Sequence, residues 1–410
     1  MTKRLYYDQP DLLGFDSVVE AVSAASGSAE ESRPALILRE SAFYPTSGGQ
    51  IHDLGWVTIG DERLRVAEVV DAEDGRVVHY LEAPTKSAIA PGTAVRGEID
   101  AERRRDHMQQ HTGQHVLSAA FIELYQFPTV SFHMGDDYCS IDLSTPAITA
   151  AQVTGAERRA NEIVFENRPV RIRYVHRDEA ERLGLRKLPP AERDELRLIE
   201  VADFDLSACG GTHVNATGQI GAILLRKTEK TRQGMRIEFV CGVRAVAAAR
   251  RDYSTLTEAA SLFSAKPADV PEMIRKSFEE LKESRRQKDE ALEQLAGAMA
   301  EADLAALPGD RRIVTRVFAD RDAAFAKLFA QKAARGSVGC VALVVSTMNP
   351  PGIVFAQTPG GKADMGALLK ETLTAVGGRG GGNRDFAQGG LPAGCDAEKL
   401  LHEVAAKIGY

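Results

Sequence analysis

Three histidines and one cysteine, grouped in two short motifs, are the strongest candidates for chemistry in this 410-residue chain. His111 and His115 are four residues apart, and Cys209 and His213 repeat the same spacing. On an α-helix, a spacing of four places both imidazoles on one face. Three imidazoles and a thiolate form a donor set that suits zinc. Together the two motifs predict a site for one zinc ion.

His107 is an alternative ligand, because His107, His111 and His115 follow one another at steps of four. The first and last of these are about 12 Å apart along a helix axis. That separation is too large for a single ion whose bonds to nitrogen are about 2 Å long. His111 is therefore a ligand in either pairing, and its partner is left open. A zinc-protease helix is excluded, since it carries Glu after the first histidine, where this chain has Thr112.

A helix and a tight turn must position these side chains. The helix has an apolar stripe next to the histidines, formed by Val116, Leu117, Ala119, Ala120 and Leu124. In the second motif, Gly210 and Gly211 let the backbone between Cys209 and His213 turn without a Cβ penalty.

Both motifs resemble those of a known family. The stretches HTGQHVLSAAF, from His111, and CGGTHV, from Cys209, are similar to the metal motifs of the editing domain of alanyl-tRNA synthetase and of the free-standing AlaX editing proteins. The resemblance implies that His111, His115, Cys209 and His213 bind one zinc ion. It also implies a trans-editing aminoacyl-tRNA hydrolase that deacylates tRNA(Ala) mischarged with serine.

The resemblance places the segment Phe127–Gly135 in the editing pocket. Ser131 and His133 offer a hydroxyl and an imidazole there, and with Cys209 they are the catalytic candidates. Such a pocket can select serine over alanine by hydrogen-bonding the extra hydroxyl, as double-sieve editing requires. Ser131, His133 or Thr112 could supply that bond. The alternative for His133 is a strand histidine with a purely structural hydrogen bond.

Composition indicates an ordinary globular protein. The chain is 44% hydrophobic and 27% charged, and no apolar run approaches the roughly 18 residues of a membrane span. Five scattered cysteines argue against a disulfide framework and favour a reducing compartment. With no signal sequence at its start, the chain is expected in the cytoplasm. A net charge of −7 means that RNA must be met by a local basic surface.

We expect an α+β protein of four parts. Residues 1–95 alternate apolar runs with turns, which predicts a small β-barrel of about six strands, similar to those of translation factors. Its stretch FYPTSGGQIHDLG, from Phe43, resembles a family segment for which a structural turn is favoured over catalysis. Residues 96–245 form the α+β zinc-containing editing domain. Residues 246–308 are helical and could mediate a homodimer, and residues 309–410 form an α/β glycine-rich domain.

Basic residues for tRNA contact are expected in two places. In the editing domain, the candidates are Arg105, Arg226, Lys227, Lys230 and Arg232, with a solvated charged face as the alternative. In the C-terminal domain, Arg379 and Arg384 lie in a glycine run, GGRGGGNRDFAQGG, that is similar to one in the C-terminal domain that alanyl-tRNA synthetases share with DHH phosphoesterases. A flexible loop is the alternative. Phosphodiester hydrolysis is not expected, because Asp106-His107-Met108 is not the phosphoesterase metal motif.

A second function remains open from the sequence. Four protein ligands close a tetrahedral zinc site, whereas catalytic zinc keeps one position free for water. The chain could therefore be an RNA-binding or assembly module whose zinc is structural, and whether the zinc is catalytic or positional stays undecided.

Overall fold

The computed structural model describes residues 1–24, 33–85, 88–183, 185, 194–232, 234–307 and 312–408. It divides into two compact units, Met1–Glu258 and Ala259–Tyr410. The expected boundary between residues 308 and 309 and the basic segment Arg186–Pro189 lie outside the described residues. The four-part division stays a prediction. None of the described helices is long and apolar enough to cross a membrane.

The N-terminal part of the first unit is a closed six-stranded barrel, as expected. Its strand order is β2-β3-β7-β6-β5-β8, and the strands are β2 (Gly14–Ala24), β3 (Pro34–Leu38), β5 (Gly55–Ile59), β6 (Glu62–Asp71), β7 (Val77–Leu81) and β8 (Ala94–Ile99). Alternate residues point inward; β6 buries Leu64, Val66 and, after a register shift, Val69. Beside the barrel, β1 (Lys3–Arg4) pairs in parallel with β4 (Glu40–Ser41), and a 3-10 turn, η1 (Leu5–Tyr7), follows β1.

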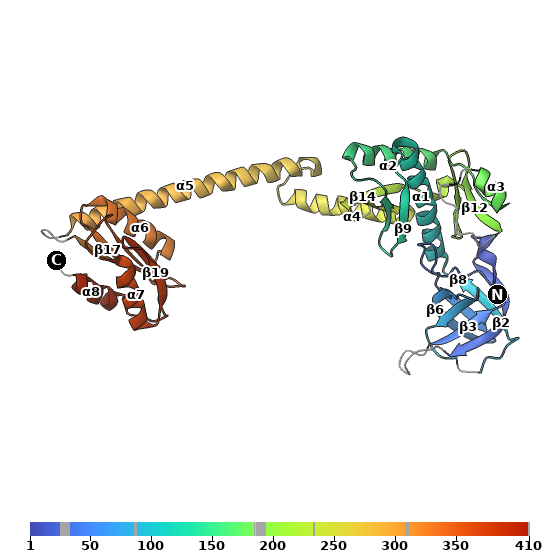
Figure 1. Ribbon diagram of the computed structural model, residues 1–410, viewed down its shortest axis with the longest axis horizontal. Coiled ribbons are helices and arrows are strands. Elements are labelled where there is room, and N and C mark those ends of the chain that lie inside the picture. Colours follow the sequence, from blue (N-terminus) through green and yellow to red (C-terminus); the bar gives the residue numbers. More distant parts are fainter. Residues whose placement is uncertain are drawn as a thin grey trace. The chain divides into compact units, whose positions relative to one another are not determined.

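One long helix carries the first metal motif. This helix, α1 (Ala101–Tyr125), begins after Asp100, whose side chain accepts the backbone N–H groups of Glu102 and Arg103. The helix packs with α2 (Ala150–Phe165) against a four-stranded sheet of order β14-β15-β10-β9. Its strands are β9 (Thr129–Met134), β10 (Cys139–Leu143), β14 (Ile223–Lys230) and β15 (Met235–Cys241) (Figure 1).

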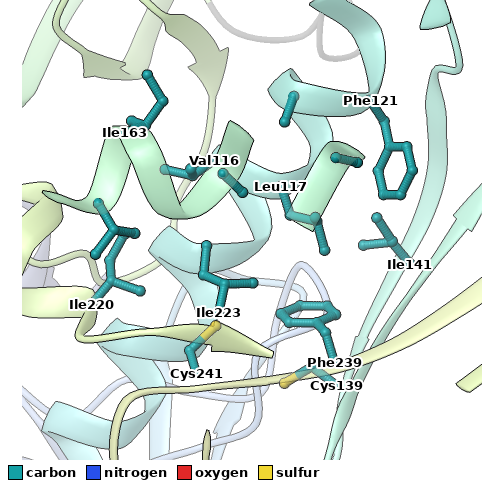
Figure 2. Packing of buried hydrophobic residues seen from close by; sticks show 14 of the residues in the cluster. Val116, Leu117, Phe121, Cys139, Ile141, Ile163, Ile220, Ile223, Phe239 and Cys241 are labelled. Carbon is teal, nitrogen blue, oxygen red and sulfur yellow. The ribbon is translucent and has the colours of Figure 1, made fainter. Parts of the chain in front are cut away.

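Val116, Leu117 and Ala120 of the apolar stripe predicted for this helix belong to the largest core of the unit, but Leu124 of the stripe is exposed, which corrects that part of the prediction. Figure 2 shows Val116 and Leu117 of α1 facing Ile163 of α2 and Ile223 of β14, with Phe239 of β15 below them. Burial of these side chains locks α1 against the sheet, so the two histidines on its other face have little freedom to move.

A three-stranded antiparallel sheet leads into the second motif. It contains β11 (Val170–His176), β12 (Glu195–Val201) and β13 (Asp205–Ala208), with α3 (Arg177–Arg182) after β11. The metal loop follows β13 directly. The sequence pattern predicts strands over residues 219–227 and 235–244, and both need correction. Residues Thr217–Ile220 form a 3-10 turn, η2, before β14, and β15 ends at Cys241 because α4 begins at Gly242.

The helical segment consists of two helices, α4 (Gly242–Ser261) and α5 (Val270–Ala305), with a 3-10 turn, η3 (Pro267–Asp269), between them. The sequence pattern predicts a helix that starts with Asp269 as its cap and has Pro271 in its first turn. Pro271 does lie in the first turn of α5, but the side chain of Asp269 makes no capping hydrogen bond. In the first half of α5, the apolar residues Ile274, Phe278 and Leu281 are exposed.

The second unit contains a five-stranded sheet of order β16-β17-β18-β20-β19, parallel between β16 and β17 and antiparallel elsewhere. The strands are β16 (Ile313–Phe318), β17 (Val341–Ser346), β18 (Gly352–Gln357), β19 (Arg379–Gly382) and β20 (Phe386–Gly390). The helices are α6 (Ala323–Gly336), α7 (Met365–Val376) and α8 (Ala397–Ile408). The sheet carries α6 on one face and α7 and α8 on the other.

The glycine run is not a loop, which corrects the alternative considered from the sequence. It forms the antiparallel pair β19–β20. A Cβ added at Gly380 or Gly389 would lie 2.6 or 2.4 Å from Leu373 of α7. The glycines therefore let this helix pack directly on the strands, which explains much of the run without any ligand.

Candidate metal centre

Four side chains form a group that could hold a metal ion within the residues that the structure describes. They are His111 and His115 of α1 and Cys209 and His213 of the loop after β13, and their ligand atoms all lie within 4.8 Å of one another. The Cys209 Sγ atom is 3.4 Å from Nε2 of His111 and 3.3 Å from Nε2 of His213. The predicted ligand set is thus brought together, although the assignment of these residues as ligands stays a prediction.

The three histidines present the same nitrogen to the centre because each ring has an outer partner. Nδ1 lies 2.8 Å from Gln50 Oε1 in His111, 3.1 Å from Asp205 Oδ2 in His115, and 3.2 Å from Thr112 Oγ1 in His213. In the tautomer that donates from Nδ1, the lone pair of Nε2 is free to bind a metal. Such outer hydrogen bonds orient metal-binding imidazoles.

The electrostatics favour a thiolate at Cys209. Burial opposes ionisation of this side chain, but its electrostatic interactions and hydrogen bonds with the surrounding histidines, chiefly His111, outweigh burial and hold the pKa of Cys209 well below its usual value of 9.0. The sulfur also accepts the backbone N–H of Gly211 at 3.3 Å. A thiolate is the form of cysteine that binds metal.

His213 and His115 differ in their pKa values and therefore in their protonation. Burial lowers the pKa of His213 to about 3, so its ring is neutral. Burial also acts on His115, but its hydrogen bonds to Asp205 and Cys209 raise its pKa to about 9. In the metal-free protein, an imidazolium at His115 thus stands between two anions. A bound cation would take over this role and release the proton.

The donor set fits zinc. Tetrahedral zinc with bonds of about 2.0 Å to nitrogen and about 2.3 Å to sulfur requires its ligand atoms to be roughly 3.3 to 3.7 Å apart. The measured sulfur–nitrogen distances of 3.3 and 3.4 Å lie close to this range. Soft thiolate and imidazole donors also prefer zinc to the hard cations calcium and magnesium.

A cavity of about 460 Å³ opens beside the four ligands. His111, His115 and Cys209 lie in its wall, and Phe132 of β9 is stacked on the His111 ring with centroids 5.3 Å apart. Its other polar side chains are Gln114, Gln126, Thr129, Ser131 and Ser207. Gln114 and Thr129 both donate to the buried hydroxyl of Ser118, at 2.8 and 2.7 Å. This cavity is the candidate site for a substrate that must reach the metal.

The structure separates the catalytic candidates. Cys209 and Ser131 line the cavity, but the Ser131 hydroxyl donates to Asp142 at 2.6 Å. His133 is exposed and lines a different pocket on the four-stranded sheet, with Ser140 and Arg236. Thr112 is fully buried and bonded to His213, so its hydroxyl does not line the cavity.

Two residues of the centre escaped the sequence argument. Gln50 and Asp205 are the outer partners of His111 and His115, yet they lie far from these histidines in the chain. The only sequence signal was a polar residue directly after Gly48-Gly49 and an acidic residue shortly before Cys209.

His107 takes no part in the cluster. It is fully buried one turn before His111, and neither ring nitrogen has a hydrogen-bond partner among the described residues. Burial, with the charges of three nearby arginines, lowers its pKa to about 2, so the ring is neutral.

The basic candidates have different surroundings. Arg105 is exposed, whereas its neighbour Arg104 in the basic run Arg103–Arg105 is buried and paired with Asp53, so this run is not one solvated face. Arg226 pairs with Asp252 and Lys227 with Glu229. Lys230 and Arg232 are exposed. A phosphate would therefore have to displace carboxylates from two of these five side chains.

The glycine strands of the second unit border a separate groove of about 470 Å³. It is lined by Lys327 of α6 and by Arg379, Gly380, Gln388 and Gly389 of the hairpin, together with residues of β18. Arg379 and Arg384 are both exposed, but only Arg379 lines the groove; Arg384 donates to the carbonyl of Gly361 at 3.3 Å.

Comparison with known families gives two matches. Residues 196–238, which include Cys209 and His213, match the family described as the threonyl and alanyl tRNA synthetase second additional domain. Residues 2–103, which cover the barrel, match the class II (A) tRNA synthetases.

Similar curated proteins are alanine–tRNA ligases. The protein from Archaeoglobus fulgidus is 32% identical over 98% of this chain, and that from Halobacterium salinarum is 35% identical over 97%. The chain covers only 44% and 43% of these relatives, less than half of their length. The resemblance to alanyl-tRNA synthetase expected from the motifs is confirmed.

Among solved structures, the C-Ala domain of alanyl-tRNA synthetase from Aquifex aeolicus matches 24% of this chain and 92% of its own length. The identity is 21% and the TM-score 0.23, which is too low to support a structural argument.

Proposed function

The chain is related to the alanine–tRNA ligases over nearly its full length, and on this basis we propose that it is a cytoplasmic aminoacyl-tRNA hydrolase that deacylates tRNA(Ala) mischarged with serine. The observation that carries the proposal is the cavity beside the group His111, His115, Cys209 and His213. Three of these four residues line the cavity, so an ester bound there would lie beside the proposed metal.

The ligands would hold one zinc ion, which as a Lewis acid favours attack on an ester carbonyl. The chain's own residues then have separate tasks. Asp205, Thr112 and Gln50 hold the ligand histidines in position. Phe132 covers one face of the His111 ring and limits the access of water from that side.

Recognition of serine fits the polar wall of the cavity. Thr129 and Gln114 already share the Ser118 hydroxyl, so their orientations are restricted. The Thr129 oxygen can still accept a hydrogen bond from a substrate hydroxyl. An alanyl ester would leave the acceptor lone pair of Thr129 unfilled, and sites built in this way reject the analogue that lacks the hydroxyl. We therefore assign the selection to Thr129 in preference to His133.

The test is deacylation of Ser-tRNA(Ala) and Ala-tRNA(Ala) by the zinc-loaded protein. We expect fast hydrolysis of the first and slow hydrolysis of the second, and Thr129→Val should reduce the difference. Equal rates on both substrates, or no hydrolysis of either, would contradict the proposal.

A second function, an RNA-binding or assembly module with structural zinc, is favoured by one observation. The ligand atoms of all four candidate side chains lie within 4.8 Å of one another, and an ion bound by all four would have no position left for water. Cys209→Ala separates the two functions. Loss of turnover with an unchanged melting temperature supports catalysis, whereas loss of folding together with the metal supports the structural role.

Binding of the tRNA body is proposed for the second unit. The groove beside β19 and β20 combines the cations of Lys327 and Arg379 with exposed backbone, a surface that phosphates can approach. Replacing Arg379 by alanine should weaken tRNA(Ala) binding and reduce its salt dependence by about one charge. Hydrolysis of a short acceptor-stem substrate should stay unchanged.

A homodimer through the exposed apolar residues of α5 is also proposed, and sedimentation of Phe278→Lys tests it.

A further inference from the structure

We infer that Gln50, which precedes the barrel strand β5, is a positioning residue of the metal centre, and this inference rests on the proposed metal site. Gln50 is fully buried. Its Oε1 atom lies 2.8 Å from Nδ1 of His111 and accepts the backbone N–H of Thr212 at 3.1 Å. Its Nε2 group donates to the Thr212 hydroxyl at 2.9 Å. One side chain thus connects both metal motifs.

These contacts determine the orientation of the amide and, through it, the tautomer of His111. A backbone N–H can only donate, so the end of the amide that faces Thr212 N must be the oxygen. His111 must then donate to the same oxygen from Nδ1, which leaves its Nε2 lone pair directed at the centre. Without Gln50 the other tautomer has no penalty, and that tautomer cannot bind metal through Nε2.

The segment that carries Gln50 is anchored along α1. The carbonyl of His52 accepts Arg103 Nε at 3.0 Å, and Asp53 forms a fully buried ion pair with Arg104. The carbonyl of Gly49 accepts the N–H of Met134 in β9 at 3.0 Å. These bonds hold the amide in place before any metal arrives, which is the condition for an effective outer partner.

Gln50 differs in origin from the other two outer partners. Thr112 lies on α1 itself and Asp205 on β13, the strand before the metal loop. Gln50 comes from the chain between β4 and the barrel strand β5. The metal centre is therefore assembled from three parts of the sequence, and metal affinity depends on the correct docking of the barrel. By linkage, the metal also stabilises that docking.

The test measures metal affinity in the full chain by competition with a chelator, and records the visible absorption of the Co²⁺ form, which reports ligand geometry. Gln50→Leu should weaken metal binding by about 10- to 100-fold and change the Co²⁺ spectrum. Gln50→Glu keeps an acceptor for both N–H groups and should restore most of the affinity. Fluorescence of Trp56, the only tryptophan of the chain and a residue of β5, reports whether the barrel is folded.

Gln109→Leu is the matched control. Gln109 is a buried glutamine of α1, the helix that carries His111, and its side chain donates a hydrogen bond to the carbonyl of Gln219. It should leave metal affinity and the Co²⁺ spectrum unchanged. Equal losses in both leucine variants, or wild-type affinity in Gln50→Leu, would overturn the inference. If Gln50→Leu does not fold, Gln50→Asn, which withdraws the oxygen by one methylene, must show the same weakening. Failure of the wild-type protein to bind zinc or Co²⁺ would instead refute the metal site itself.

Discussion

Two glycine-containing segments of this protein use the same residue for different purposes. In the loop after β13, Gly211 leaves room for the candidate ligand His111: a Cβ there would lie 2.2 Å from the His111 ring. In the hairpin β19–β20, Gly380 and Gly389 leave room for the helix α7. A glycine motif therefore indicates that another group approaches the backbone closely. Only the fold shows whether that group is a candidate metal-binding side chain or a neighbouring helix.

The largest effect is expected from Gly211→Ala, because its methyl group must displace His111 or the Gln50 oxygen, both closer than ordinary contact distance. We expect metal affinity to fall by more than the roughly 10- to 100-fold typical of losing an outer partner. Gly210→Ala is the control in the same loop, since its Cβ would meet only Tyr7, at 3.6 Å. Chelator competition on both variants checks this, and similar affinities would show that Gly211 does not limit the site.

Buried histidines allow a second comparison. His79 of the barrel is buried like the candidate metal ligands, but its hydrogen-bond partners are structural. Its ring nitrogens lie 2.7 Å from the Ser41 hydroxyl and 3.0 Å from the Leu36 carbonyl. Burial lowers its pKa from 6.5 to about 4. Between pH 6.5 and pH 4 the unfolded state binds a proton that the folded state does not. The contribution of His79 to the free energy of unfolding is therefore complete above pH 6.5 and falls by about 3 kcal/mol as the pH drops towards 4.

Denaturant unfolding followed by Trp56 fluorescence at a series of pH values between 4 and 7 measures this loss. His79→Gln keeps a donor and an acceptor but does not titrate, and it should flatten the pH dependence. An identical slope in the variant would assign the loss to other groups.

A smaller effect is expected in the hairpin for Gly389→Ala. Its Cβ would lie 2.4 Å from a methyl group of Leu373 and 2.7 Å from the Arg379 carbonyl. Overpacking of this kind costs about 1 to 3 kcal/mol. Thermal unfolding of the C-terminal unit checks the value, and an unchanged melting temperature would mean that α7 can move away without cost.

The smallest effect on stability is expected for Gly381→Ala in the same hairpin, since nothing lies within 4 Å of its Cβ position. This variant distinguishes a packing role of the glycine run from a binding role, because packing does not require glycine at this position. If tRNA(Ala) binding weakens while the melting temperature is unchanged, the open face of the hairpin is a binding surface. If neither changes, packing accounts for the run.

Local pattern predicted much of the fold. The six-stranded barrel was expected from short apolar runs between turns. Strands expected over residues 313–318 and 352–356 and a helix expected over 365–376 lie within one residue of β16, β18 and α7. Boundaries failed at η2 and at the start of α4, where long-range packing replaced an extended pattern with a turn and a helix. The hairpin was missed because glycine has no side-chain periodicity to indicate a strand.

The local pattern of the chain was enough to predict the candidate ligands, since spacings of four and the chemistry of imidazole and thiolate are local properties. The groups that surround those candidate ligands depend on the tertiary structure. It directed Gln50 and Asp205 to the outer nitrogens of His111 and His115, buried Arg104 against Asp53, and placed His133 in another pocket. These outcomes depend on contacts between residues far apart in the chain, and no local spacing encodes them, because strand pairing and helix docking set which side chains meet.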